Sequence, residues 1–198
     1  MRKTISFLRG RVVLNAPVTL GFTAICLLAY LLGVITDDSS TVALFSVYRS
    51  SALNPLFWLR LVCHVFGHAT WEHLIGNMML FLILAPMLEE KYGSSALAAL
   101  IVVTAVITGL FSILFFPRVM LLGASGVIFA LILLSSITDA KAGEIPLTFL
   151  LVAVLYLGRE LLTIFRQDNI SQTAHIIGGI AGAAFGFAMA RRADSLSR

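Results

Sequence analysis

The sequence predicts an all-α membrane protein, built as a bundle of six transmembrane helices with a membrane-embedded loop after the first helix. Composition is the first reason: 59% of the 198 residues are hydrophobic and 12% are charged, whereas a soluble domain carries about a quarter charged residues. Spacing is the second reason, since a spanning helix needs about 20 apolar residues. Six stretches meet or approach that length: roughly 17–36, 71–88, 95–116, 121–138, 145–165 and 173–190.

The segment between the first two stretches supplies the third reason. It is apolar, but polar residues and a proline interrupt it: Arg49, Asn54, Pro55 and Arg60. Its uninterrupted runs are too short to cross a bilayer, so we expect it to lie at the membrane surface or half inserted.

The first stretch follows a basic segment, as the apolar core of a signal peptide does. Its apolar run is too long for a signal peptide, however, and no small-residue cleavage site follows it, so we expect an anchor that is retained. The length allows one bundle and no second domain. The expected organisation is a cytoplasmic N-terminal tail over 1–16, a transmembrane domain over 17–190 and a cytoplasmic C-terminal tail over 191–198.

Lysines and arginines predict the orientation. With six spans both termini face the same side, and nine of the fourteen basic residues fall there: Arg2, Lys3, Arg9, Arg11, Lys91, Lys141, Arg191, Arg192 and Arg198. The other side has the remaining five: Arg49, Arg60, Arg118, Arg159 and Arg166. The positive-inside rule therefore predicts cytoplasmic termini. Because the basic residues lie at the chain ends and in short loops, the net charge of +4 does not indicate nucleic-acid binding.

Counting along the helices brings several polar side chains to one depth. At about 1.5 Å per residue, Asn77 and His73 lie about 18 Å and about 24 Å above the cytoplasmic end of their helix. Ser125 and His175 lie about 21 Å and about 24 Å above the ends of theirs. The hydrocarbon layer is about 30 Å thick. Four polar side chains on three helices thus share one layer below the outer surface, and ionisable residues inside a membrane tend to mark function.

Ser125 lies in the motif GASG, between Gly123 and Gly126. Only about fourteen residues separate it from Asp139, so the helix after it is too short to span and must begin inside the membrane. Glycine permits a tight turn there, and the free amides of the helix start would face the serine, where an oxyanion could develop. A lone membrane serine more often bonds a carbonyl of its own helix, so the interpretation depends on its neighbours.

His175 opens the last stretch, in AHIIGGIAGAAFG, ahead of the small-residue pair Gly178 and Gly182. Such pairs let a neighbouring helix approach closely, and alone the motif would indicate only a packing face. At the depth of Ser125, however, a histidine on a packed neighbouring helix would be within hydrogen-bonding reach, as a base is of its nucleophile. No acidic residue shares that depth, so we expect a Ser125–His175 dyad. Phe129, one turn after the serine, is a candidate to hold the imidazole by packing.

The segment HVFGHATWEHLIGN, residues 64–77, carries three histidines and an asparagine. His73 and Asn77 lie four residues apart on one helix face, where donors could stabilise an oxyanion together with the backbone amide of Ser125. His64 and His68 precede the helix and are expected to tie the loop down by hydrogen bonds. A zinc site is the alternative, since histidines four residues apart can bind zinc. No HExxH motif is present and no carboxylate shares the depth, so we expect neither a metal nor a cofactor.

Together these motifs resemble the rhomboid family of intramembrane serine proteases: the histidines and asparagine spaced by four, five and four over 64–77, GASG at 123–126, and AHxxGxxxG at 174–182. The resemblance runs from about Arg60 to Gly186 and implies a six-helix rhomboid-like bundle. It also implies structural roles for Arg60, in the embedded loop, and for Glu89, at the end of the second helix. Phe129 stands where well-known bacterial members carry tyrosine, and Leu59 where they often carry tryptophan.

The resemblance implies cleavage of peptide bonds in or beside transmembrane segments of other proteins. It assigns four roles: nucleophile to Ser125, general base to His175, and oxyanion-hole donors to His73 and Asn77. Expected partners are transmembrane protein substrates and the lipid bilayer, and the expected location is a bacterial plasma membrane, with the site open to the extracytoplasmic side. One alternative is a catalytically inactive relative that binds membrane helices for quality control, although such proteins usually lack the serine or the histidine. A small transporter is another, but transporters tend to show repeats and ionisable residues near the midplane.

Overall fold

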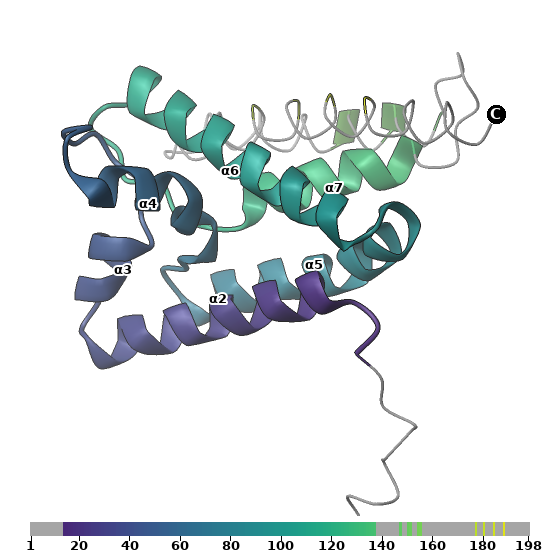
Figure 1. The fold of residues 1–198 in the computed structure, drawn as a ribbon, viewed down its shortest axis with the longest axis horizontal. Coiled ribbons are helices and arrows are strands. Elements are labelled where there is room, and N and C mark those ends of the chain that lie inside the picture. The colour runs from purple at the N-terminus through teal and green to yellow at the C-terminus, as the bar shows by residue number, and fades with distance from the viewer. Residues whose placement is uncertain are drawn as a thin grey trace, which may run out of the picture.

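A computed structural model of the chain describes residues 14–137 and nine isolated positions further on: 147, 150, 151, 154, 155, 177, 180, 184 and 188. Between residues 14 and 137 every named element is a helix, in agreement with the predicted all-α class (Figure 1). In chain order they are α2 (Pro17–Ile35), α3 (Ser39–Leu44), α4 (Pro55–Cys63), the 3-10 turn η1 (His64–Phe66), α5 (Trp71–Tyr92), α6 (Ser94–Phe115) and α7 (Ser125–Ile137). The predicted fifth and sixth spans lie outside this range, so the count of six stays a prediction.

Three of these helices are long and apolar enough to cross a membrane: α2, α5 and α6. Their bounds match the predicted stretches 17–36, 71–88 and 95–116 to within four residues. Within the fourth predicted stretch, 121–138, the helix starts at Ser125, in agreement with the prediction that the serine lies near the start of a helix that begins inside the membrane. Gly123 has φ +118°, a conformation that does not continue a helix. The described part of α7 has 13 residues and extends to Ile137. The predicted end of this helix near Asp139 lies outside the described residues.

Helix α5 packs against α2, α6 and α7 (Figure 1). Its contact with α2 is made by a narrow apolar stripe on α2, in which Phe22 stacks on Phe81 with ring centroids 4.4 Å apart. On the other side of α2, large apolar side chains such as Leu28 and Val34 are exposed. An exposed apolar surface of this kind suits contact with lipid.

The short helices α3 and α4 lie together at the end of the bundle where α2 ends and α5 begins, on the left of Figure 1. Helix α4 begins with Pro55 in its first turn, and the Asn54 side chain caps it by accepting a hydrogen bond from the Leu56 amide at 2.9 Å. With nine residues, α4 is far too short to cross a bilayer. Whether this loop is embedded in the membrane stays a prediction.

At the opposite end of α5, the buried carboxylate of Glu89 joins three helices. One oxygen accepts hydrogen bonds from the Val18 amide at 2.9 Å and the Ser94 hydroxyl at 2.7 Å. The other accepts from the amide and hydroxyl of Thr19 at 2.9 and 2.7 Å. The free amides at the start of α2 thus receive a charged acceptor, which fixes the ends of α2, α5 and α6 against one another.

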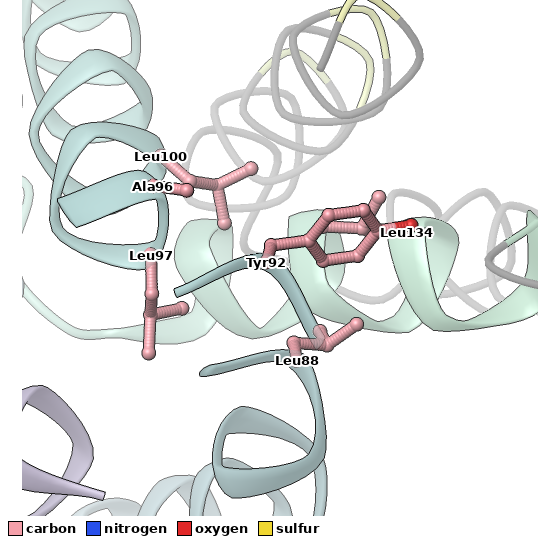
Figure 2. A pocket seen from close by; sticks show the side chains of 6 residues that line it. All are labelled: Leu88, Tyr92, Ala96, Leu97, Leu100 and Leu134. Atoms are coloured by element: carbon pink, nitrogen blue, oxygen red, sulfur yellow. The ribbon is translucent and has the colours of Figure 1, made fainter. Parts of the chain in front are cut away.

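The same end of the bundle contains a small apolar pocket between α5, α6 and α7 (Figure 2). It is lined by Leu88, Tyr92, Ala96, Leu97, Leu100 and Leu134. Leu88 lies fifteen residues after His73 on α5, which is about 22 Å along the helix axis. The pocket is therefore remote from the polar residues described next.

Candidate active site

Ser125 is the first residue of α7, at the end of a tightly held loop. The first hydrogen bond of the helix runs from the Ile128 amide to the Ala124 carbonyl at 2.9 Å. Before it, Gly123 adopts φ +118° and donates its amide to the His64 carbonyl at 2.9 Å. The amides of a first helical turn have no acceptor within their own helix, so this loop presents hydrogen-bond donors and a hydroxyl at one point.

The loop before Ser125 is also joined to the segment that follows α3. Val47 and Leu121 form an isolated antiparallel bridge, in which each amide donates to the other residue's carbonyl at 2.9 Å. Val47 is 1% exposed. Buried backbone groups in this irregular region are therefore paired, as buried polar groups require, and the bridge and the Gly123–His64 bond hold the serine loop from two sides.

His73 lies directly beside the glycine of this loop. A Cβ atom added to Gly123 would lie 2.9 Å from Cε1 and 3.0 Å from Nε2 of His73, and 3.7 Å from Oγ of Ser125. The histidine ring and the serine hydroxyl therefore both border the space above the Gly123 Cα atom. His73 is held in the first turn of α5, where its amide donates to the Thr70 side chain at 3.2 Å.

Asn77, one turn further along α5, bonds to His68 rather than standing alone. Its Nδ2 atom lies 3.0 Å from Nε2 of His68, and Nδ1 of His68 lies 3.1 Å from the Phe66 carbonyl oxygen. The rings of His68 and His73 meet edge to face with centroids 5.0 Å apart. His68 is 2% exposed and Asn77 is 9% exposed. The segment 64–77 thus brings His68, His73 and Asn77 into one cluster beside the serine loop.

His64 is fully enclosed behind that loop. Its Nδ1 atom lies 3.2 Å from the Arg60 carbonyl, and its Nε2 atom lies 3.3 Å from the Thr108 hydroxyl on α6. Burial lowers the pKa of His64 to about 4. Burial, together with the neighbouring His73, lowers the pKa of His68 to about 4 as well. Both rings are therefore neutral at pH 7, and both are held by the hydrogen bonds given above.

Arg60 is 5% exposed and is held within the first loop. Its Nε atom donates to the Ala43 carbonyl at 2.9 Å, and its guanidinium lies over the Tyr48 ring at 4.4 Å. A buried guanidinium needs such partners to offset the cost of desolvation. Arg60 thereby connects α4 to α3 through Ala43 and to the segment after α3 through Tyr48.

The second half of the expected dyad lies outside the described residues. This holds for His175 and for the small-residue pair Gly178 and Gly182. Phe129 is 0% exposed on α7, one turn after Ser125. The pairing of Ser125 with His175, and the packing of Phe129 on its ring, stay predictions.

A metal centre is not supported within the described part of the chain. Among those residues, no group of three or more histidine, cysteine or acidic side chains is close enough to hold a metal ion. The ring nitrogens of His64 and His68 have hydrogen-bonding partners instead.

Thr108 is a residue that reasoning from the sequence missed. Its hydroxyl bonds the His64 ring, and its methyl group would lie 3.2 Å from a Cβ atom added to Gly126. It therefore supports both the loop and the serine turn. A signal was present, because Thr104, Thr108 and Ser112 recur every four residues and so form one polar face on an otherwise apolar helix.

Two comparisons with known proteins, one with family models and one with individual proteins, point to the same family. The family model described as the Rhomboid domain matches residues 55–192. The chain is 30% identical over 175 residues to proteins named Rhomboid protease GlpG from Serratia proteamaculans (strain 568), Yersinia pestis (strain Pestoides F) and Yersinia pseudotuberculosis serotype O:3 (strain YPIII). Each alignment covers 86% of this chain and 62% of the relative. The chain thus matches less than two thirds of the length of these relatives.

Proposed function

The chain belongs to the rhomboid family, and on that premise we propose that it is an intramembrane serine endopeptidase that cleaves peptide bonds in or next to transmembrane segments. The observation that carries the proposal is that the His73 ring and the Ser125 hydroxyl border the same space beside Gly123. A nucleophile and an oxyanion donor must border the same small space, because the attacked carbonyl contacts both.

Ser125 is the proposed nucleophile. Its position at the start of α7 supports this role, because the first-turn amides and the positive end of the helix dipole favour negative charge there. The left-handed turn at Gly123 brings the backbone close to His73 without a side chain in between. A substrate carbonyl can therefore approach the Ser125 hydroxyl and the Ser125 backbone amide together.

His175 is the proposed general base. Its motif lies within the region matched by the Rhomboid domain, 55–192. The proposed sequence of steps needs no cofactor. His175 takes the proton of the Ser125 hydroxyl as Oγ attacks the scissile carbonyl carbon. The carbon–nitrogen bond then breaks, and the imidazolium gives its proton to the leaving amine. Water, deprotonated by the same ring, hydrolyses the acyl-enzyme and restores the serine.

His73 and Asn77 are the proposed oxyanion donors, with the Ser125 amide. The two side chains come from one face of α5, and His73 borders the space beside Ser125. Donors fixed in this way stabilise charge that develops only in the transition state. They therefore increase kcat more than they increase the affinity for substrate.

The proposed substrates are transmembrane helices that unwind near the site, because a helical peptide shields its carbonyls. Segments with glycine, proline or serine near their outer end should unwind most readily. We further propose the six-helix topology over 17–190, with cytoplasmic termini, a site open to the extracytoplasmic side of a bacterial plasma membrane, and substrate entry between the second and fifth spans.

The test is cleavage of a reporter transmembrane segment by the purified full chain in proteoliposomes, with products identified by mass spectrometry. We expect one or two cuts within or beside the segment, and loss of both products in Ser125→Ala and in His175→Ala. A folded Ser125→Ala protein that still cuts the reporter would refute the assignment.

A further inference from the structure

We propose that His68 is a positioning residue that fixes the orientation of the Asn77 side-chain amide, so that one of its N–H groups is offered to the oxyanion. The inference rests on the proposed function, because it gives His68 a role in the chemistry at Ser125. It goes beyond the expected role of His68, which was to tie down the loop.

The tautomer of His68 follows from its two partners. Nδ1 lies 3.1 Å from the Phe66 carbonyl oxygen, which can only accept, so Nδ1 carries the hydrogen. Because the buried ring is neutral, Nε2 then has a lone pair. The Asn77 nitrogen, 3.0 Å away, must be the donor to that lone pair.

This tautomer determines which way the Asn77 amide faces. With the amide turned over, its oxygen would face the lone pair of His68 Nε2, and two acceptors would oppose each other in a buried site. Both side chains are buried, so their orientation is set by contacts within the protein. One N–H of Asn77 donates to Nε2 of His68. The other N–H points away from His68 and can donate to another acceptor, such as the oxyanion.

The position of His68 suits this role, because it contacts both proposed donors. Its ring bonds Asn77 on one side and meets the His73 ring edge to face on the other. His73 in turn borders Gly123 and the Ser125 hydroxyl. Without His68, the Asn77 amide loses its partner and can rotate, while its place on α5 is unchanged. The loss should therefore affect transition-state stabilisation and not substrate binding.

The experiment compares kcat and KM for four variants of the full chain in detergent with a reporter transmembrane substrate: Asn77→Ala, His68→Ala, the double variant, and His68→Gln. We expect Asn77→Ala to lower kcat by about 100-fold and His68→Ala by about ten-fold or more, with KM nearly unchanged. The double variant should lose no more kcat than Asn77→Ala, because each single change removes the same donor, the N–H of Asn77. His68→Gln should recover activity, since its amide oxygen can accept from Asn77.

Leu88→Ala is the control for stability alone, because it enlarges the remote pocket without touching the site. It should lower the melting temperature without lowering kcat of the folded protein. The inference is overturned if His68→Ala stays within about two-fold of wild-type kcat, or if the losses of the single variants multiply in the double. It is also overturned if Leu88→Ala, at equal loss of stability, lowers kcat as much.

A second measurement does not depend on activity or on replacing His68. In ¹⁵N-histidine-labelled protein, the His68 signals should show a protonated Nδ1 and an unprotonated Nε2, and Asn77→Ala should shift the Nε2 signal. The opposite tautomer, or an Nε2 signal that ignores Asn77→Ala, overturns the inference. If cleavage requires Ser125 but not His68, the inference alone fails. If no cleavage depends on Ser125, the proposed function fails and the inference with it.

Discussion

Gly123 lies so close to His73 that a Cβ atom at position 123 would overlap the imidazole, 2.9 Å from its Cε1 atom. The glycine also has φ +118°, a region that side-chain-bearing residues rarely adopt. Position 123 therefore requires glycine for two separate reasons, one of backbone conformation and one of contact with a proposed donor.

Gly123→Ala should therefore strain the serine loop by about 1–3 kcal/mol and push the His73 ring aside. We expect a larger loss of reporter cleavage than the loss of thermal stability explains. Gly76→Ala is the matched control, because a Cβ there meets no atom of the described residues within 4 Å and Gly76 lies on the exposed side of α5. Equal activity in the two variants would contradict the close approach of His73.

Thr108→Val should lower thermal stability, because it removes the hydroxyl behind the serine loop. The substitution keeps the shape but removes a buried hydroxyl that donates to the Thr104 carbonyl at 2.8 Å and contacts His64 Nε2 at 3.3 Å, which costs about 1–3 kcal/mol of unfolding free energy. Thr104→Val is the control one turn away, since the buried Thr104 hydroxyl finds no partner among the described groups. Thermal unfolding in detergent should show a clear loss for Thr108→Val alone, and similar losses in both would argue against the His64 contact.

Glu89→Gln should reduce stability while sparing catalysis. An uncharged amide accepts through one oxygen only, and its nitrogen would face donors from α2 or α6, so we expect a loss of about 2–4 kcal/mol. Glu89 lies sixteen residues after His73, about 24 Å along α5. Cleavage per folded molecule should be unchanged, and the exposed neighbour variant Glu90→Gln should lose neither property. A loss of kcat without a loss of stability in Glu89→Gln would contradict a purely structural role for Glu89.

Acidification should destabilise the fold through His64 and His68. Their pKa values are about 4 in the folded protein and near 6.5 when exposed, so the unfolded chain binds more protons between these limits. The stabilisation is complete above pH 6.5 and declines as the pH falls towards 4, by about 1 kcal/mol per pH unit for each ring. Melting temperatures measured across this range should fall with pH, less steeply in His68→Gln. His73 is the titratable neighbour of His68. If melting temperature falls with pH as steeply in His68→Gln as in the wild type, burial of His68 does not contribute to the pH dependence.

Much of this arrangement could be predicted because it follows from helix geometry. The constant rise of a helix predicts that His73 and Ser125 share a depth, and the structure brings them together at Gly123. The motif GASG and the short distance to Asp139 likewise predict that Ser125 lies near the start of a helix, and α7 begins at this residue. Both predictions use only local spacing and the thickness of the bilayer.

Contacts made through irregular segments could not be predicted in the same way. The bridge between Val47 and Leu121 joins two loops whose paths depend on the packing of α3 and α4, and no periodic pattern encodes it. For His68, the sequence predicts a hydrogen bond that ties down the loop, and one ring nitrogen makes it. The other nitrogen bonds Asn77, because the turn after η1 brings the ring back against α5.

The most direct measurement is site-mapped labelling of the folded full chain with a fluorophosphonate probe, which reacts with an activated serine. The account predicts one modified residue, Ser125, with labelling abolished in His175→Ala and slowed in Gly123→Ala but preserved in Gly76→Ala. Folded protein in which Ser125 remains unlabelled, or is labelled equally well without His175, would contradict it and would favour a relative that binds membrane helices without cutting them.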